Sequence, residues 1–223
     1  MARESKGMDV GAGVVGLFAG LAAGPVADRL ATNAPARLPL LAAAPPSRRL
    51  LYVTAATGLL GGCSGVAFGF TFEALIAAVF CWILVVVTRT DLEHRLIPNR
   101  IVVPGAVLLV GARTIDDPSP EWLLAALGAG FVLFAIVFVY PKGMGMGDVK
   151  LAALLGAGLG VSVVVALFIG FLAAFVPALA LIVRHGGAAR KRAIPLGPFL
   201  ALGGIVALFA GDAILDWYTG LGA

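Results

Sequence analysis

The chain has 223 residues, of which 61% are hydrophobic and only 13% are charged, and its mean hydropathy is +1.03. A soluble domain of this length cannot hide so much apolar surface, so the composition excludes a water-soluble globular protein. It predicts an all-α fold, a polytopic bundle of transmembrane helices. The net charge of +4 does not require a nucleic-acid partner, because basic residues that orient a protein in the membrane account for it. We expect no nucleic acid among the partners.

Apolar runs close to the roughly 20 residues that cross a bilayer core predict about eight membrane spans. In chain order they lie near residues 9–27, 50–70, 72–88, 97–113, 121–140, 149–162, 163–183 and 196–215. The fourth and sixth runs are short or interrupted by glycine, which favours partial helices sheltered inside the bundle. Whether residues 149–183 form one span or two stays open, because Gly156 to Ser162 is either a turn or part of one long helix.

We expect a single integral-membrane domain over residues 1–223. Residues 1–49 hold the first span and a short cytoplasmic loop, and residues 50–223 form the core of the domain. The first 34 residues also resemble a secretory signal peptide. Cleavage there is disfavoured, because it would leave an odd number of spans.

The basic residues predict that the N-terminus faces the outside of the cell. Eight crossings from that side place four linkers in the cytoplasm, at residues 28–49, 89–100, 141–150 and 184–193. These linkers hold thirteen of the sixteen basic residues, namely Arg29, Arg37, Arg48, Arg49, Arg89, Arg95, Arg100, Lys142, Lys150, Arg184, Arg190, Lys191 and Arg192. Only Arg3, Lys6 and Arg113 lie on the other side, which is the asymmetry that the positive-inside rule requires.

Acidic residues at membrane depth are costly and are therefore functional candidates. Four of them stand at predicted helix ends where they reach water, and we interpret these as interfacial: Asp28, Glu73, Asp212 and Asp216. Cys63 and Cys81 lie within apolar runs at no metal-ligand or redox spacing, so we expect buried packing residues. We expect no metal and no other cofactor.

Asp91 and Asp148 form the candidate catalytic pair. Asp91 follows an apolar run, Asp148 follows the Gly-rich stretch 143–147, and two crossings lie between them, so both reach the same side of the membrane. When two carboxyl groups share a site, one keeps its proton and polarises a peptide carbonyl while the other takes a proton from water. This is the chemistry of an aspartic protease. On spacing alone, a helix cap is an equally good interpretation of Asp148.

Three segments carry a more specific signal. The first, residues 90–99, is TDLEHRLIPN, in which an Asp is followed six residues later by Ile97, Pro98 and Asn99. The second, residues 145–151, is GMGDVKL, with Gly145, Gly147, Asp148 and Lys150. The third, residues 194–201, is IPLGPFLA. In this order they resemble the two catalytic-aspartate motifs, the second of G-x-G-D type, and the last-helix signature of the type IV prepilin peptidases. The resemblance extends from about residue 50 to about residue 215.

The resemblance implies a membrane-embedded aspartic endopeptidase of the cell membrane. Its partners are a prepilin or pseudopilin precursor, whose class III leader is cleaved on the cytoplasmic side, and membrane lipids. Asp91 and Asp148 match the catalytic positions, and supporting roles fall to Gly145, Gly147, Lys150, Ile97, Pro98 and Asn99. Lys150 would bias the protonation of the pair, and Pro98 would end one element before the fourth span begins.

The chain departs from this family in two places. Many members carry a large loop after the first span, with two C-x-x-C pairs and a second activity that methylates the new N-terminus. Residues 31–49 form a short segment without cysteine, so we expect a short form with peptidase activity and without that zinc-binding loop. Whether it methylates the new N-terminus stays open. The usual end of the first span is also altered, to Gly-Pro-Val-Ala-Asp-Arg at residues 24–29.

Two other classes of function are alternatives to the peptidase. A small ion- or proton-coupled transporter would use Asp91 and Asp148 as ligands, and a structural scaffold would hold them as capped helix ends. A transporter predicts repeats in the two halves of the chain and charged groups near the bilayer midplane. The sequence has neither feature, since both aspartates lie at a predicted membrane boundary.

Overall fold

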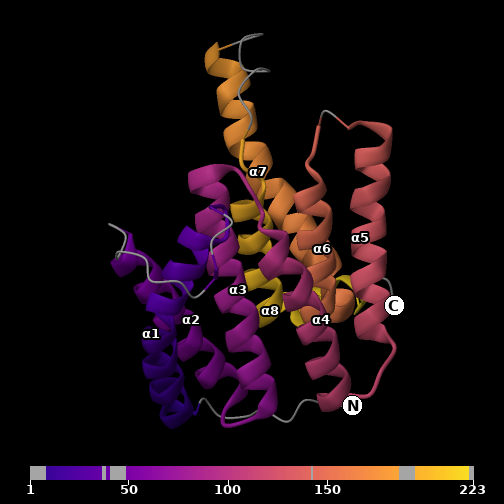
Figure 1. Ribbon diagram of the computed structural model, residues 1–223. Helices are drawn as coiled ribbons and strands as arrows, with labels where there is room; N and C mark the ends of the chain where they lie inside the picture. Colours follow the sequence, from indigo (N-terminus) through magenta and orange to yellow (C-terminus); the bar gives the residue numbers. More distant parts are fainter. Residues whose placement is uncertain (1–8, 37–38, 41–48, 142, 186–193, 221–223) are drawn as a thin grey trace.

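The computed structural model describes residues 9–36, 39–40, 49–141, 143–185 and 194–220, and every structural statement refers to these residues. They form eight α-helices and one 3₁₀ turn and contain no strand. The helices are α1 (Val10–Asn33), α2 (Leu50–Phe68), α3 (Phe72–His94), α4 (Asn99–Asp116), α5 (Glu121–Val139), α6 (Met146–Leu159), α7 (Val163–His185) and α8 (Gly197–Gly220), with the turn η1 at Gly160–Ser162. The prediction of an all-α helix bundle is confirmed (Figure 1).

Six helical segments are long and apolar enough to cross a membrane. They are α1, α2, α3, α5, α8 and the stretch Met146–Arg184, which counts as one segment because α6, η1 and α7 follow each other without a gap. α4 has the length of a span but carries three charged residues, Arg100, Arg113 and Asp116. The predicted runs match the eight helices one to one, although several helices continue beyond the apolar runs.

The chain reverses direction between α6 and α7. Gly160, the first residue of η1, has a φ of +58°, a backbone conformation that residues other than glycine rarely adopt. The backbone N–H of Val161 donates to Glu121 Oε1 at 2.9 Å, so the reversal lies at the end of the bundle where α5 begins. The α5–α6 connection lies at the opposite end, at the top of Figure 1. Residues 149–183 therefore form two antiparallel segments.

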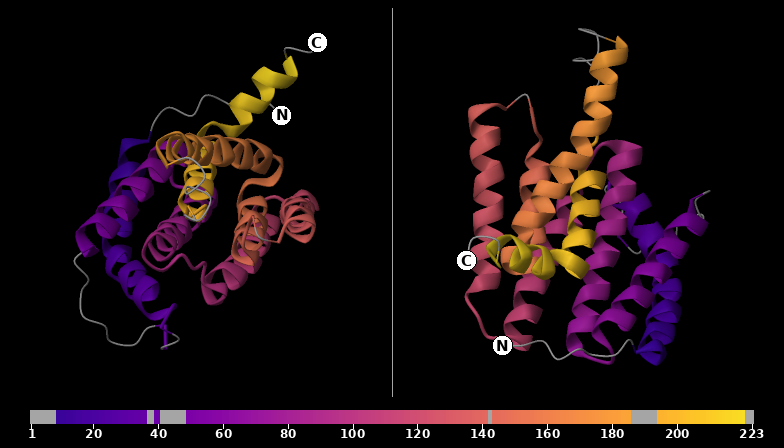
Figure 2. Two further views of the ribbon diagram at one scale, coloured as in Figure 1. Left: turned by 90° about the horizontal axis from the view of Figure 1, so that it is seen from above. Right: turned by 180° about the vertical axis from the view of Figure 1, so that it is seen from behind.

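α3 is the central helix. It packs against α1, α2, α4, α6 and α8, and its side chains at Phe80, Leu84, Val86 and Val87 are fully buried. Figure 2 shows α1 and α2 on one side of α3 and α8, with α5 and α6 on the other. The outer helices instead expose large apolar side chains such as Val107, as lipid-facing surfaces do. Asp91 lies in the last turns of this central helix.

α1 and α2 form a closely packed hairpin. A Cβ at Gly16 would lie 2.2 Å from the carbonyl oxygen of Gly61, and one at Gly20 would lie 2.2 Å from that of Thr57. Only glycine permits this approach of two helix backbones, which is the usual means of helix association in membranes.

Two expectations about single residues are wrong. Asp28 is not interfacial, because it is only 2% exposed and is paired with the buried Arg89. Cys63 is exposed rather than buried, whereas Cys81 is buried as expected. Several of the basic residues from which the orientation was predicted lie outside the described part of the chain, namely Arg3, Lys6, Arg37, Arg48, Lys142, Arg190, Lys191 and Arg192.

Candidate active site

Four helix ends enclose a cavity of about 560 Å³ that both candidate aspartates line. α3 ends there, and α4, α6 and α8 begin there. The lining residues are Asp91, Arg95, Leu96, Ile97, Asn99, Gly143, Met144, Gly145, Met146, Gly147, Asp148, Lys150, Ile194, Pro195 and Leu196. All three motif segments thus meet at one cavity, although the last begins 95 positions after the first ends.

Asp91 is fixed by the start of α8. Its side chain is only 5% exposed, and its Oδ2 accepts a hydrogen bond from the backbone N–H of Gly197 at 2.9 Å. A Cβ at Gly197 would lie 2.8 Å from the same oxygen, so only glycine leaves room for the carboxyl group. The motif around Gly197 could be recognised in the sequence, but its contact with Asp91 could not be predicted from it.

Asp148 is the third residue of α6, and its Oδ2 accepts the backbone N–H of Gly145 at 3.1 Å. The interpretation of Asp148 as a helix cap is therefore correct for one of its oxygens, and it does not exclude a second role. Gly147 packs directly on the side chain of Ile97, where an added Cβ would come within 3.0 Å. This contact brings the start of α6 against the α3–α4 connection.

The supporting motif residues also interact with each other. Lys150 Nζ donates a hydrogen bond to Asn99 Oδ1 at 2.9 Å, which joins α6 to the start of α4. Pro98 is the N-cap residue of α4, and it thus ends the α3–α4 connection where the sequence predicted a break. The predicted effect of Lys150 on the protonation of the aspartates stays a prediction, because its described hydrogen bond goes to Asn99.

Arg95 and the two methionines of the cavity were not predicted as site residues. Arg95 ends α3 in the left-handed conformation, with a φ of 51°, and it lines the cavity beside Asp91. A non-glycine residue in this conformation is uncommon and is frequently found at functional sites. Met144 and Met146 add flexible apolar side chains to the lining. No sequence pattern distinguishes these residues from their neighbours.

The arrangement offers acid–base chemistry. Within the described residues neither Asp91 nor Asp148 forms a salt bridge, and no group of three metal-ligating side chains lies close enough to hold a metal ion. The cavity combines the two carboxyl groups with the exposed glycines at positions 143 and 145, where an extended peptide can approach. Such a site can bind a peptide and activate water.

Comparisons with known proteins agree with the motifs. The model of the type IV leader peptidase family matches residues 78–183, which include both aspartates. A prepilin leader peptidase/N-methyltransferase of Bacillus subtilis is 36% identical over 167 residues, which cover 73% of this chain and 66% of the relative. The chain belongs to the type IV leader peptidase family. It is a multi-pass membrane protein.

Two further relatives are also prepilin leader peptidase/N-methyltransferases by name. The protein of Legionella pneumophila is 31% identical over 185 residues, covering 79% of this chain and 64% of the relative. The protein of Pseudomonas aeruginosa is 33% identical over 181 residues, covering 77% of this chain and 61% of the relative. The chain thus spans about two thirds or slightly less of these relatives. No solved structure matches.

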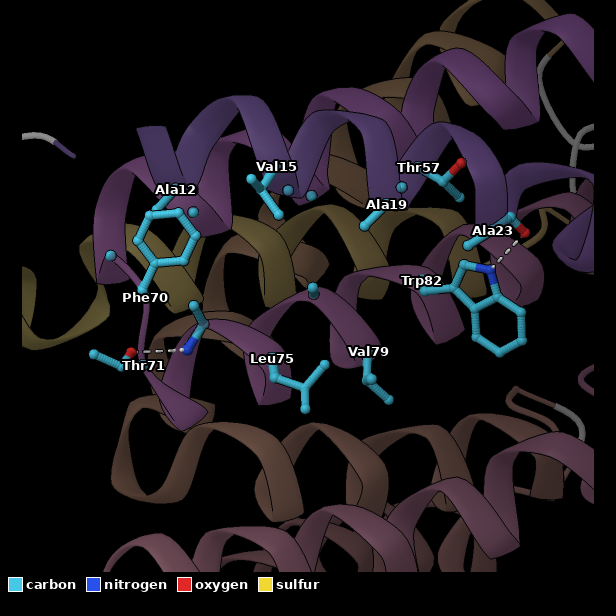
Figure 3. A pocket seen from close by; sticks show the side chains of 17 residues that line it. Ala12, Val15, Ala19, Ala23, Thr57, Phe70, Thr71, Leu75, Val79 and Trp82 are labelled. Atoms are coloured by element: carbon cyan, nitrogen blue, oxygen red, sulfur yellow. Dashed lines mark hydrogen bonds between the residues drawn. The ribbon is translucent and has the colours of Figure 1, made fainter. Parts of the chain in front are cut away.

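A larger cavity of this leader-peptidase family member lies away from the aspartates. It has a volume of about 620 Å³ and lies between α1, α2 and α3 (Figure 3). At one end Trp82 Nε1 donates to the carbonyl oxygen of Ala23 at 3.2 Å, and Phe70 stands at the other end. Its lining includes no acidic, basic or histidine side chain, so it offers no groups for catalysis.

Proposed function

We propose that this chain is an aspartic endopeptidase that cleaves the leader peptide of type IV prepilins or pseudopilins at the cytoplasmic face of the cell membrane. Asp91 and Asp148 are its catalytic residues. The observation that carries the proposal is that both aspartates line one cavity with the three motif segments. The names of the relatives support the substrate class.

The proposed reaction is a hydrolysis in which water is the nucleophile. The ionised aspartate takes a proton from water while the protonated aspartate donates a hydrogen bond to the carbonyl oxygen of the scissile peptide bond. The water oxygen forms a bond to the carbonyl carbon, and the C–N bond then breaks as the leaving amine takes a proton from the pair. No covalent enzyme intermediate forms, and no metal takes part.

The chain itself supports this reaction in two ways. Gly197 donates its N–H to Asp91 and Gly145 donates its N–H to Asp148, so each carboxyl group is oriented by a backbone group. In this proposal residues 50–223 form the peptidase core. N-methylation is left out of the proposal, because residues 31–49 contain no cysteine.

Cleavage of a pilin precursor by the purified, membrane-reconstituted protein tests the proposal. Wild type is expected to shorten the precursor at its leader junction, whereas Asp91→Asn and Asp148→Asn are expected to be inactive, because Asn keeps the size of the side chain and cannot ionise. Asp216→Asn, at an exposed acid in α8, serves as the matched control and should retain activity. Full activity of either Asn variant at position 91 or 148 would refute the dyad.

A further inference from the structure

A buried ion pair joins the first and third helices. Arg89 of α3 and Asp28 of α1 are 6% and 2% exposed, and their Nη1 and Oδ1 atoms lie 2.6 Å apart. Arg89 Nη1 also donates to the backbone carbonyl oxygen of Asp28 at 2.6 Å, and its Nη2 donates to Thr32 Oγ1 at 3.1 Å. One guanidinium group therefore makes three contacts with the end of α1.

The ion pair continues into a chain of charges across three helices. Arg89 Nε lies 3.4 Å from Glu93 Oε1, one helical turn further along α3. The same oxygen lies 3.3 Å from Arg49 Nη1, beside the start of α2. The order Asp28, Arg89, Glu93 and Arg49 alternates acid and base and joins α1, α3 and α2 at the end of the bundle that holds Asp91.

Arg89 precedes Asp91 by two residues, which places the two side chains about 200° apart around α3. They therefore point to opposite sides of the helix. Arg89 holds α3 against α1, and Asp91 holds it against the first residue of α8 through Gly197. The last turns of α3 are thus fixed from two sides. The helix end has little freedom to rotate, and the Asp91 carboxyl group has little freedom to shift.

The ion pair joins a helix inside the family match to one outside it. The match to the family model begins at residue 78, so α1 and α2 lie outside it. Asp28 lies in α1, near its C-terminal end. Breaking a buried ion pair by removing one partner is strongly destabilising, so neutralising Asp28 or Arg89 alone is expected to destabilise the protein.

We infer that Arg89, through its ion pair with Asp28, is a positioning residue for Asp91, so that the first helix takes part in catalysis without touching substrate. The inference rests on the proposed function for its kinetic consequence. A loss of the pair lets the end of α3 shift, and a shift of about 1 Å in a catalytic group can lower the rate roughly 100-fold. Substrate binding depends on other parts of the cavity and changes little.

The test compares two ion pairs of α3 that lie at opposite ends. The double variant Asp28→Asn with Arg89→Gln removes both charges of the buried pair, while Glu93 keeps its contact with Arg49. The matched control, Glu73→Gln with Arg113→Gln, removes the pair in which Arg113 Nη1 lies 3.9 Å from Glu73 Oε1. Arg113 is 7% exposed, so both arginines are buried to the same extent. Each variant is measured for kcat, KM and its thermal unfolding temperature.

The expected result is a drop in kcat of roughly tenfold or more for the Asp28/Arg89 variant, with KM close to that of wild type. The Glu73/Arg113 variant should lose thermal stability and keep its kcat. Arg89→Lys should retain an intermediate kcat, because Lys keeps one charged contact and loses the fork of Arg. Unchanged kcat in the Asp28/Arg89 variant, or an equal loss in both double variants, would overturn the inference.

A second readout needs no cleavage and separates this inference from the proposed function. In a protein with Cys63→Ala and Cys81→Ala, the substitution Asp91→Cys places a thiol where the carboxyl group lies, and its rate of alkylation reports the packing there. Neutralising Asp28 and Arg89 should raise this rate several-fold, whereas neutralising Glu73 and Arg113 should leave it unchanged. If wild type cleaves no precursor, the proposed function fails, and the alkylation rate alone then supports or overturns the positioning by Arg89.

Discussion

The backbone N–H of Gly197 donates a hydrogen bond to Asp91 Oδ2 across 106 residues of sequence. It joins the end of the central helix α3 to the beginning of α8. The glycine satisfies two conditions at once, because its N–H orients the carboxyl group and its missing side chain leaves space for it. The last-helix motif is thereby connected to the first catalytic-aspartate motif.

Gly197→Ala is expected to lower peptidase activity by roughly 100-fold, because the new Cβ would displace the Asp91 carboxyl group by a substantial part of 1 Å. The added Cβ would lie 2.8 Å from Asp91 Oδ2 and 3.2 Å from its Cβ. The measurement is the kcat for precursor cleavage by reconstituted protein. Gly128→Ala is the matched control, since nothing lies within 4 Å of a Cβ there. Equal kcat values for the two variants would contradict the assigned role of Gly197.

The hydrogen bond between Lys150 and Asn99 predicts coupled effects on activity. Lys150→Ala and Asn99→Ala should each lower kcat, and the double variant should lose little more than either single variant, because both changes remove the same contact. The contact is exposed, so the cost in unfolding free energy is only about 1 kcal/mol. A double-mutant cycle on kcat and on thermal unfolding checks this. Fully additive losses in kcat would show that the two residues act separately.

Several features of the fold follow from local sequence. Apolar runs predicted each helix near its observed place, and the reversal at Gly160 follows from a glycine in a conformation that other residues rarely adopt. The contacts that decide individual side chains could not be predicted in this way. Asp28 stands at a predicted helix end, and its burial depends on Arg89, 61 residues away. The contact of Gly197 with Asp91 likewise exists only in the folded bundle.

The cavity shows the same division between local and distant information. Asp148 and Gly145 are three residues apart, so their contact belongs to a capping motif that a sequence can reveal. The place of Met144 and Arg95 in the lining depends instead on how α3, α4 and α6 meet. Motif residues are therefore predictable from sequence, whereas the side chains that complete the cavity are not.

The short segment between α1 and α2 predicts that cleaved substrate keeps an unmodified N-terminus. Residues 31–49 hold no cysteine, so the chain lacks the pairs that would form a zinc-binding loop there. Mass spectrometry of the processed pilin, with S-adenosylmethionine present as methyl donor, should give the mass of the unmethylated product. A product heavier by one methyl group, formed by the purified protein, would contradict this prediction.

The proposed orientation predicts which ends of the helices face the cytoplasm. The α5–α6 connection lies at the same end as Asp91 and Asp148, and the α4–α5 connection lies at the opposite end, as Figure 1 shows. In a protein with Cys63→Ala and Cys81→Ala, Pro141→Cys marks the first end and Asp116→Cys marks the second, and both positions are exposed. A membrane-impermeant maleimide added to intact cells or spheroplasts should label position 116, whereas position 141 should react only after the membrane is opened. The reverse pattern would place the aspartates outside, and cleavage of the leader in the cytoplasm would then be impossible.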